Sequence, residues 1–237
     1  MSLTIAIEPH PLLDVGAFVI RSPRTLGELA TPAAIAALGE PGAAAPLTPP
    51  AQIKTAVRDL LREGGYKPSG RGKPASEYLA ATVAQAAFPR INALVDACNV
   101  ASLHTGLPIS LVDLDRLDRL DRLDRLDRLD RLDPLDPLGR STGLTIRIAP
   151  AGTTYVFNPS GQTIDASGLL CLCDAQGPAG TPVKDAQRTK THDATTAALA
   201  IVWGTRAVPG WTAHATRWYR DLVGGITGLV LQDVALT

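Results

Sequence analysis

One stretch, residues 88–115, constrains the fold more than any other, because a helix, a stop signal and a buried strand follow one another directly. Apolar and small residues over 94–102 recur at spacings of three and four, which predicts a helix with a small-residue inner face. Asn92 suits the N-cap, and Gly106 ends the helix. Residues 109–112 then form a short apolar run, typical of a buried strand.

Polar residues also follow a pattern within this predicted helix. Asn92, Asp96 and Asn99 are spaced i, i+4 and i+7, so they share one helix face. This face either belongs to a binding site or is the solvated side of the helix, with Asp96 and Asn99 serving in capping and backbone support.

Composition narrows the classes of protein that the chain can be. Of its 237 residues 45% are apolar, enough for a substantial core, and the formal net charge of zero disfavours a globally basic nucleic-acid binder. Three cysteines fit a reducing compartment better than a disulfide framework. The N-terminus lacks the pattern of a signal peptide, and no apolar run is long enough to span a membrane. We therefore expect a cytoplasmic protein that has no membrane segment.

The rest of the chain alternates between strand and helix patterns. Strands are predicted at 3–7, 15–20, 144–148, 154–157, 169–173 and 199–202, and helices at 24–38, 51–63, from 76, from 193 and at 212–223. We expect an α+β fold, in which residues 1–237 form a single domain with a mixed sheet and packed helices.

Two cysteines lie within one of these predicted strands. Cys171 and Cys173 alternate with Leu170 and Leu172, so both thiols face the same side of the strand. They are either two small buried residues or a metal-binding pair, although no other cysteine or histidine pair has the spacing of a zinc site.

Residues 114–138 contain a Leu-Asp-Arg repeat that ends in LDPLDPL. A period of three slips by about 60° per repeat around an α-helix, so no lasting apolar face forms. Asp and Arg at i, i+4 can still support a solvated helix. We interpret this segment as a low-complexity insertion between two strands, with a protein-binding arm as the alternative.

Two polar, cationic loops stand out as candidate binding segments. The first, 65–77, carries Lys67, Arg71 and Lys73 and leads into a helix whose start includes Ser76 and Glu77. Exposed backbone and cations before a helix N-terminus suit an anion, although a solvated surface loop is the alternative. The second loop, 181–192, is unusually polar and holds Lys184, Asp185, Gln187, Arg188, Thr189, Lys190 and Thr191.

Familiar catalytic signatures are missing from the sequence. It contains no Walker loop, no strand-linked GxGxxG, no GxSxG and no HExxH, and its four histidines are scattered. We therefore expect no metal and no cofactor. Cations combined with Asp and amide groups in the two loops suit a ligand that carries phosphate or carboxylate.

Three segments together resemble a known family. GYKPSGRGKPASEYL at 65–79, FPRINALVDACNVASLHTGLPISLVDLD at 88–115 and PVKDAQRTKTHDAT at 182–195 are similar to a free-standing B3/B4-domain protein. This is the domain of the phenylalanyl-tRNA synthetase beta subunit that edits misacylated tRNA. The likeness spans most of residues 10–225, and the family has only a short linker where this chain has the repeat.

The resemblance implies hydrolysis of the ester that joins a wrong amino acid to tRNA, in which a positioned water, oxyanion donors and a side-chain sieve suffice. The chain departs from the synthetase pattern at Ser110, where a histidine is usual, and at Gln187, where an acid is usual. The alternative is a non-catalytic module of the same fold that binds RNA or an amino-acid-like ligand.

The expected site residues come from all three segments. Asp185 is the candidate for positioning water, with Lys184 and Arg188 as its charge partners. Candidates for substrate binding are Lys67, Arg71, Lys73, Ser76, Glu77, Asn92, Asp96, Asn99, Gln187, Thr189, Lys190 and Thr191. The expected partner is a mischarged tRNA.

Overall fold

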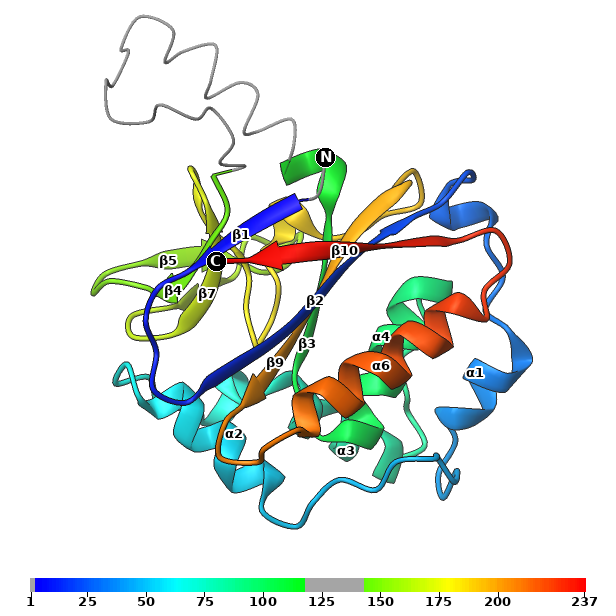
Figure 1. The fold of residues 1–237 in the computed structure, drawn as a ribbon, viewed down its shortest axis with the longest axis horizontal. Coiled ribbons are helices and arrows are strands. Elements are labelled where there is room, and N and C mark those ends of the chain that lie inside the picture. The colour runs from blue at the N-terminus through cyan, green and yellow to red at the C-terminus, as the bar shows by residue number, and fades with distance from the viewer. Residues whose placement is uncertain (1–2, 118–142) are drawn as a thin grey trace, which may run out of the picture.

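The chain is built around one eight-stranded mixed sheet (Figure 1). The structure is a computed structural model that describes residues 3–117 and 143–237. The strand order is β3-β9-β2-β10-β1-β4-β7-β8, where β1 pairs in parallel with β10 and β4 and every other pair is antiparallel. The strands are β1 (Leu3–Ile7), β2 (Leu13–Arg21), β3 (Ile109–Asp113), β4 (Thr145–Ile148), β7 (Leu170–Asp174), β8 (Gly177–Gly180), β9 (Ala197–Thr205) and β10 (Val230–Leu236). A separate hairpin joins β5 (Thr154–Val156) and β6 (Thr163–Asp165).

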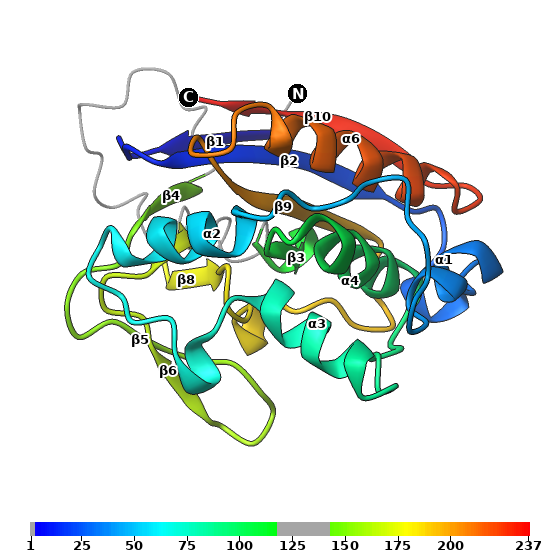
Figure 2. The ribbon, with the colours of Figure 1, turned by 90° about the horizontal axis from the view of Figure 1, so that it is seen from below.

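Helices pack against this sheet, so the α+β prediction is confirmed. They are α1 (Ala33–Leu38), α2 (Ile53–Arg62), α3 (Ala75–Ala84), α4 (Ala93–Thr105) and α6 (Trp211–Gly224), with 3-10 turns η1 (Leu26–Glu28), η2 (Gly70–Gly72) and η3 (Gln187–Thr189). Figures 1 and 2 show α4 and α6 side by side against the sheet, with α3 on the outer side of α4. No helix in the described part of the chain is long and apolar enough to cross a membrane.

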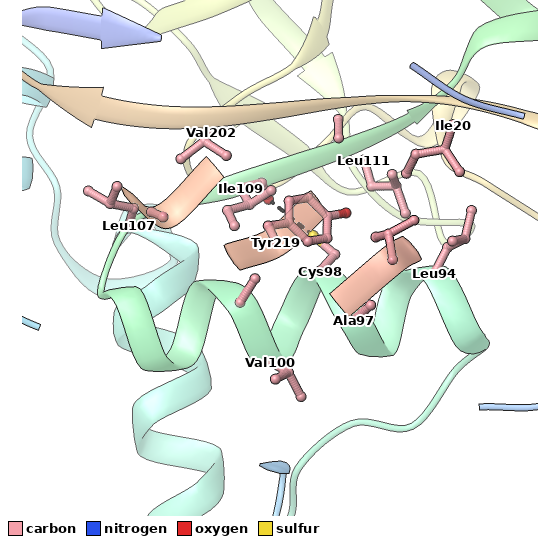
Figure 3. Close-up of a cluster of buried hydrophobic side chains, with 14 of the residues drawn as sticks. Ile20, Leu94, Ala97, Cys98, Val100, Leu107, Ile109, Leu111, Val202 and Tyr219 are labelled. Atoms are coloured by element: carbon pink, nitrogen blue, oxygen red, sulfur yellow. Dashed lines mark hydrogen bonds between the residues drawn. The ribbon is translucent and has the colours of Figure 1, made fainter. Parts of the chain in front are cut away.

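Strand β9 is central because both of its faces are buried along its whole length. Side chains alternate along a strand, so Ala198, Ala200 and Val202 join the cluster under α4 and α6. Leu199, Ile201 and Trp203 join a second cluster, which lies against β1, β4 and β7. Figure 3 shows the helix-side cluster, where small residues let the helices approach the sheet closely.

The two ends of the sheet lie against each other. A Cβ built on Gly180 of β8 would lie 3.3 Å from Val112 Cγ1 and 3.4 Å from Ser110 Cβ, both on β3. The Ser110 hydroxyl also donates to the Thr181 carbonyl at 3.1 Å. The sheet is thus nearly closed on itself where its edge strands β3 and β8 meet. Gly180, which has no Cβ, permits this close approach.

Most predicted elements are present. The strands predicted at 3–7, 15–20 and 109–112 are β1, β2 and β3, and their observed ends lie within two residues of the predicted ends. The helices predicted at 51–63 and 212–223 are α2 and α6. The prediction for the cysteine pair is also confirmed. Cys171 and Cys173 pack in a third cluster, behind β7, while Leu170 and Leu172 pack in the second.

Two predictions differ from the structure, and one strand was not predicted. The helix predicted from Asp193 is wrong, because the loop there is held to Asp113 by a hydrogen bond from Thr195 and a close contact of His192, and it runs directly into β9. The stretch 24–38 is helical only in η1 and α1, since residues 29–32, which include Pro32, form neither helix nor strand. Strand β10 has no predicted counterpart. Most of the predicted 114–138 insertion lies outside the described residues.

Candidate functional site

Helix α4 is fixed at both ends as its sequence predicts. Asn92 Oδ1 accepts from the Val95 N–H at 3.0 Å, and Gly106 adopts a left-handed φ of 71°. The buried Asp96 accepts from Thr31 Oγ1 at 2.7 Å and from the Ile91 N–H at 2.8 Å. Asn92 and Asp96 therefore hold the start of the helix. Of the three polar residues on this face, Asn99 lines a cavity.

This cavity has a volume of about 250 Å³ and lies where α4, β3 and the loop after β8 meet. Its aliphatic wall comes from α4, β3, Ile91 and the first residue of α3, and its polar end comes from the loop. The lining residues are Ala75, Ile91, Val95, Cys98, Asn99, Ile109, Leu111, Thr181, Val183, Lys184, Asp185, Lys190 and Thr191. The helix that carries Asn99 and the 181–191 loop thus meet at one cavity, whereas the 65–77 loop contributes only Ala75 to its lining.

Asp185 supplies the carboxylate of the cavity. Its Oδ1 accepts from the Thr181 N–H and its Oδ2 from the Leu111 N–H, each at 3.1 Å. Burial raises the pKa of Asp185, while the nearby Ser110 hydroxyl and the two backbone donors act in the opposite direction. The side chain is consequently held in one orientation, with its remaining lone pairs available to a ligand or a water.

The turn that carries Asp185 is held rigidly from below. Thr181 Oγ1 accepts from the N–H groups of Val183 and Lys184 at 3.2 and 3.1 Å. The buried Tyr155 hydroxyl lies 3.0 Å from Thr181 Oγ1 and donates to the Lys184 carbonyl at 2.7 Å. Burial raises the pKa of Tyr155, so this hydroxyl keeps its proton and remains a donor. The backbone at Lys184 and Asp185 is therefore pre-organised.

Two lysines bring positive charge to the cavity in different ways. Lys190 Nζ donates to the Phe157 carbonyl at 2.6 Å, and the nearby Asp185 charge favours its protonated form. Lys184 Nζ lies 4.3 Å from the centre of the Phe157 ring. Desolvation lowers the pKa of both lysines, and for Lys184 the Arg71 charge lowers it further. The cavity therefore combines one carboxylate with two amino groups.

Other polar residues of the same loop point elsewhere. Arg188 makes a bidentate ion pair with the buried Asp174, with both N–O distances at 2.7 Å, and also donates to the carbonyls of Gly177 and Pro178. The buried Thr189 hydroxyl donates to the Ala179 carbonyl at 2.7 Å. Arg188, Gln187 and Thr189 do not line the cavity. Arg188 instead ties the loop to the β7–β8 hairpin.

The loop at 65–77 forms a hollow of its own. Lys67, Ser69 and Arg71 line an open hollow of about 560 Å³, together with residues of the β5–β6 hairpin that include Asp165. The charge of Arg71 contributes to the lowered pKa of Lys184. Arg71 itself lines this hollow and does not line the cavity.

The start of α3 is engaged mainly in packing. Glu77 makes a bidentate ion pair with Arg58 of α2, at 2.6 and 2.7 Å, and Lys54 lies 3.8 Å away. Ser76 is buried beside a smaller hollow that Gly106 also lines. Lys73 adds its charge near Glu77. These three predicted binding residues lie outside the walls of the cavity.

Ser110, where the resemblance leads one to expect histidine, is a buried structural residue. It accepts from Trp203 Nε1 at 2.8 Å in addition to its bond to Thr181. Its neighbours Ile109 and Leu111 face the cavity, while Ser110 does not line it.

The sequence alone did not identify the apolar half of the cavity. Val95, Cys98 and Asn99 have the i, i+3, i+4 spacing of one helix face, and Ile109 and Leu111 alternate on a strand. Such spacing predicts residues that pack in the hydrophobic core. Apolar residues that line a cavity have the same spacing, so the sequence cannot tell the two apart.

Comparison with known families gives one result. A family model described as the B3/4 domain matches residues 69–208, more than half of the chain. A search of curated proteins gives no significant match. The matched region contains α3, α4, β3 and the 181–191 loop, and thus most of the cavity lining.

Proposed function

Because the chain belongs to the B3/4 domain family, we propose that it is a free-standing deacylase that hydrolyses the ester of a misacylated tRNA. The observation that carries this proposal is the position of Asp185, whose carboxylate is fixed by two backbone N–H groups at the polar end of an otherwise aliphatic cavity. An aminoacyl ester is already activated, so a fixed carboxylate that orients water, together with a cation, supplies the necessary chemistry.

Each polar group has a place in this reaction. Asp185 accepts a hydrogen bond from the attacking water and orients it toward the ester carbonyl carbon. Lys190, anchored on the Phe157 carbonyl, keeps donors free for the oxygen that becomes negative in the tetrahedral intermediate. Removal of one such donor typically costs 10²–10³ in rate. Collapse of the intermediate releases the amino acid and the ribose hydroxyl of the tRNA.

The size of the cavity supports an aminoacyl group as its occupant. About 250 Å³ lies below the roughly 300–1,000 Å³ of typical ligand pockets, so an amino acid fits and a nucleotide stays outside. Lys67 and Arg71, in the hollow of the 65–77 loop, suit the phosphates of the terminal nucleotides. Asn99 lies in the aliphatic wall, where its amide can read the side chain of the amino acid.

The experiment is to incubate the purified chain with a panel of tRNAs, each charged with a wrong amino acid. We expect release above the no-enzyme rate for at least one of them, and a loss of about 10²-fold or more in Asp185→Asn. If every member of the panel is released only at the no-enzyme rate, the chain is not a deacylase of misacylated tRNA.

One observation favours a second candidate, a binding module without catalysis. Ser110 replaces the histidine that is usual in the synthetase subunit, and its hydroxyl accepts from Trp203 and donates to the Thr181 carbonyl. This candidate predicts saturable binding of aminoacyl-tRNA, weakened by Arg71→Ala and by salt, with no turnover.

A further inference from the structure

The exposure of the lining residues shows where the cavity opens. Cys98, Leu111 and Val183 are buried and form its inner part. Ala75, the first residue of α3, is half-buried, and Ile91, which precedes α4, is 67% exposed. We call these last two residues the rim of the cavity, because the lining reaches solvent there.

Tyr78 lies one helical turn after Ala75 on the same face of α3. The start of this helix is fixed on the 181–191 loop, because the Ala75 N–H donates to the Pro182 carbonyl at 3.0 Å. Ser76 and Glu77 line the smaller hollow, on another side of the helix. Long side chains in helices lean back over the preceding turn, so the Tyr78 ring lies toward Ala75 and the rim.

The Tyr78 side chain is exposed and has no partner of its own. It is 59% exposed, and within residues 3–117 and 143–237 its ring and hydroxyl make no ring contact, hydrogen bond or ion pair. Ile91 and Tyr78 are the two most exposed large hydrophobic side chains of these residues. One exposed apolar side chain needs no explanation, but two of them beside the opening of one cavity mark a surface that a ligand can cover.

The size of the cavity decides which part of the ligand lies at this surface. In an aminoacyl-tRNA the amino acid is esterified to the ribose of the terminal adenosine. A cavity of about 250 Å³ takes the amino acid alone, so the ribose and the adenine stay at the rim. Proteins hold unpaired bases by stacking them on exposed aromatic side chains, and Tyr78 is such a side chain.

We propose that the Tyr78 ring stacks on the adenine of the terminal nucleotide and thereby holds the ester at the opening of the cavity. This proposal rests on the deacylase function proposed above and assigns Tyr78 to substrate binding, not to the chemical step. Stacking needs the ring and not the hydroxyl, so Tyr78→Phe keeps the interaction and Tyr78→Ala removes it.

The first test measures binding and needs no turnover. The probes are adenosines that carry a 3′-amide-linked amino acid, one for each amino acid of the tRNA panel, and the same compounds without the base. By calorimetry we expect Tyr78→Ala to weaken the adenosine compound that binds best by about 5–150-fold, the usual range for one stacked base, and to leave its base-free counterpart unchanged. Tyr78→Phe should bind both compounds as the wild type does.

Two controls separate stacking from a general effect on the fold. Val230→Ala alters another exposed apolar side chain, 55% exposed and on β10, and should change neither affinity. Tyr78→Ala should unfold at the wild-type temperature, because the side chain is mostly exposed. Equal affinity of the wild type and Tyr78→Ala for the adenosine compound would overturn the proposal, and so would an equal loss with the base-free compound.

The second test is deacylation of the tRNA that is hydrolysed fastest. We expect Tyr78→Ala to raise KM and to leave kcat unchanged, since stacking is the same in the ground state and in the transition state. Hydrolysis with an unchanged KM in Tyr78→Ala would overturn the stacking and leave the deacylase function intact. Binding that depends on Tyr78, without release from any tRNA, would support the stacking and overturn the deacylase function. If no adenosine compound binds to the wild type, the stacking is overturned as well.

Discussion

Single residues in the 181–191 loop have separate tasks that their shared polarity conceals. Asp185, Lys184 and Lys190 face the cavity, whereas Arg188 faces Asp174 and two carbonyls. A sequence pattern cannot separate these roles, because a lysine that lines a cavity and an arginine that pairs with a buried carboxylate look alike in a run of charged residues. The difference comes from the β7–β8 hairpin, which brings a buried carboxylate to Arg188 from a distant part of the chain.

Arg188→Ala is expected to destabilise the fold strongly, because it leaves Asp174 buried and without its bidentate partner. Breaking a buried pair in this way typically costs about 3–5 kcal/mol. Chemical denaturation measures the loss. Arg188→Lys keeps the positive charge but cannot make the bidentate pair, so its stability should lie between those of the wild type and Arg188→Ala. If Arg188→Ala kept wild-type stability and lost only activity, the residue would act in the cavity and not in the scaffold.

At the scale of elements, helix α6 packs closely against the sheet at a position where β2 has a glycine. A Cβ on Gly16 of β2 would lie 1.9 Å from Thr216 Oγ1 and 2.9 Å from Thr216 Cβ on α6. Contacts of this kind depend on two elements that meet only in the folded chain. The sequence showed β2 and α6 clearly, but not that they cross at this glycine.

We therefore expect Gly16→Ala to cost about 1–3 kcal/mol through overpacking. Thr216→Ala removes the nearest of the clashing atoms, so the double variant should recover part of this loss. The free energies of unfolding of the four proteins form a double-mutant cycle. Strictly additive effects would show that α6 does not press on β2 at this position.

The ion pair between α2 and α3 gives a pH-dependent prediction. The hydrogen bond from Arg58, followed by nearby positive charge, lowers the pKa of Glu77 in the folded state. A lowered carboxyl pKa stabilises the fold above the unfolded value, about 4.3, and this stabilisation is lost as the pH falls through the folded value. The stability difference between the wild type and Glu77→Gln should thus be present at pH 7 and vanish toward pH 3. A difference that stays constant over this range would contradict the ion pair.

At the scale of the whole molecule, the alternating apolar pattern was enough to predict an α+β fold with a mixed sheet. The pattern could not reveal the strand order, in which the last strand β10 lies between β1 and β2. Strand β10 is mostly exposed, so it lacks the apolar alternation of a half-buried strand. The sequence singled out the 181–192 loop and Asn99, which do meet at one cavity, but the cations of the 65–77 loop line a separate hollow. The aliphatic wall was hidden among core residues.

The Leu-Asp-Arg segment gives a prediction at this scale. Leu117 and Leu144, which flank residues 118–142, are both buried in the second cluster. We expect that replacing 118–142 by a Gly/Ser linker of about ten residues, which spans roughly 17 Å, preserves the fold. Loop length alone changes stability by only about 0.6 kcal/mol per doubling. Thermal unfolding checks this expectation, and failure of the shortened chain to fold would show that the segment is part of the core.

The central claim is that an aminoacyl group enters the cavity between α4, β3 and the 181–191 loop. A crystal structure with a non-hydrolysable analogue, an adenosine that carries a 3′-amide-linked amino acid, tests this claim most directly. We predict that the aminoacyl group lies against Asp185 and Lys190, with the ribose toward Arg71. An analogue bound elsewhere on the chain, or an empty cavity at a saturating concentration of the analogue, would contradict the account.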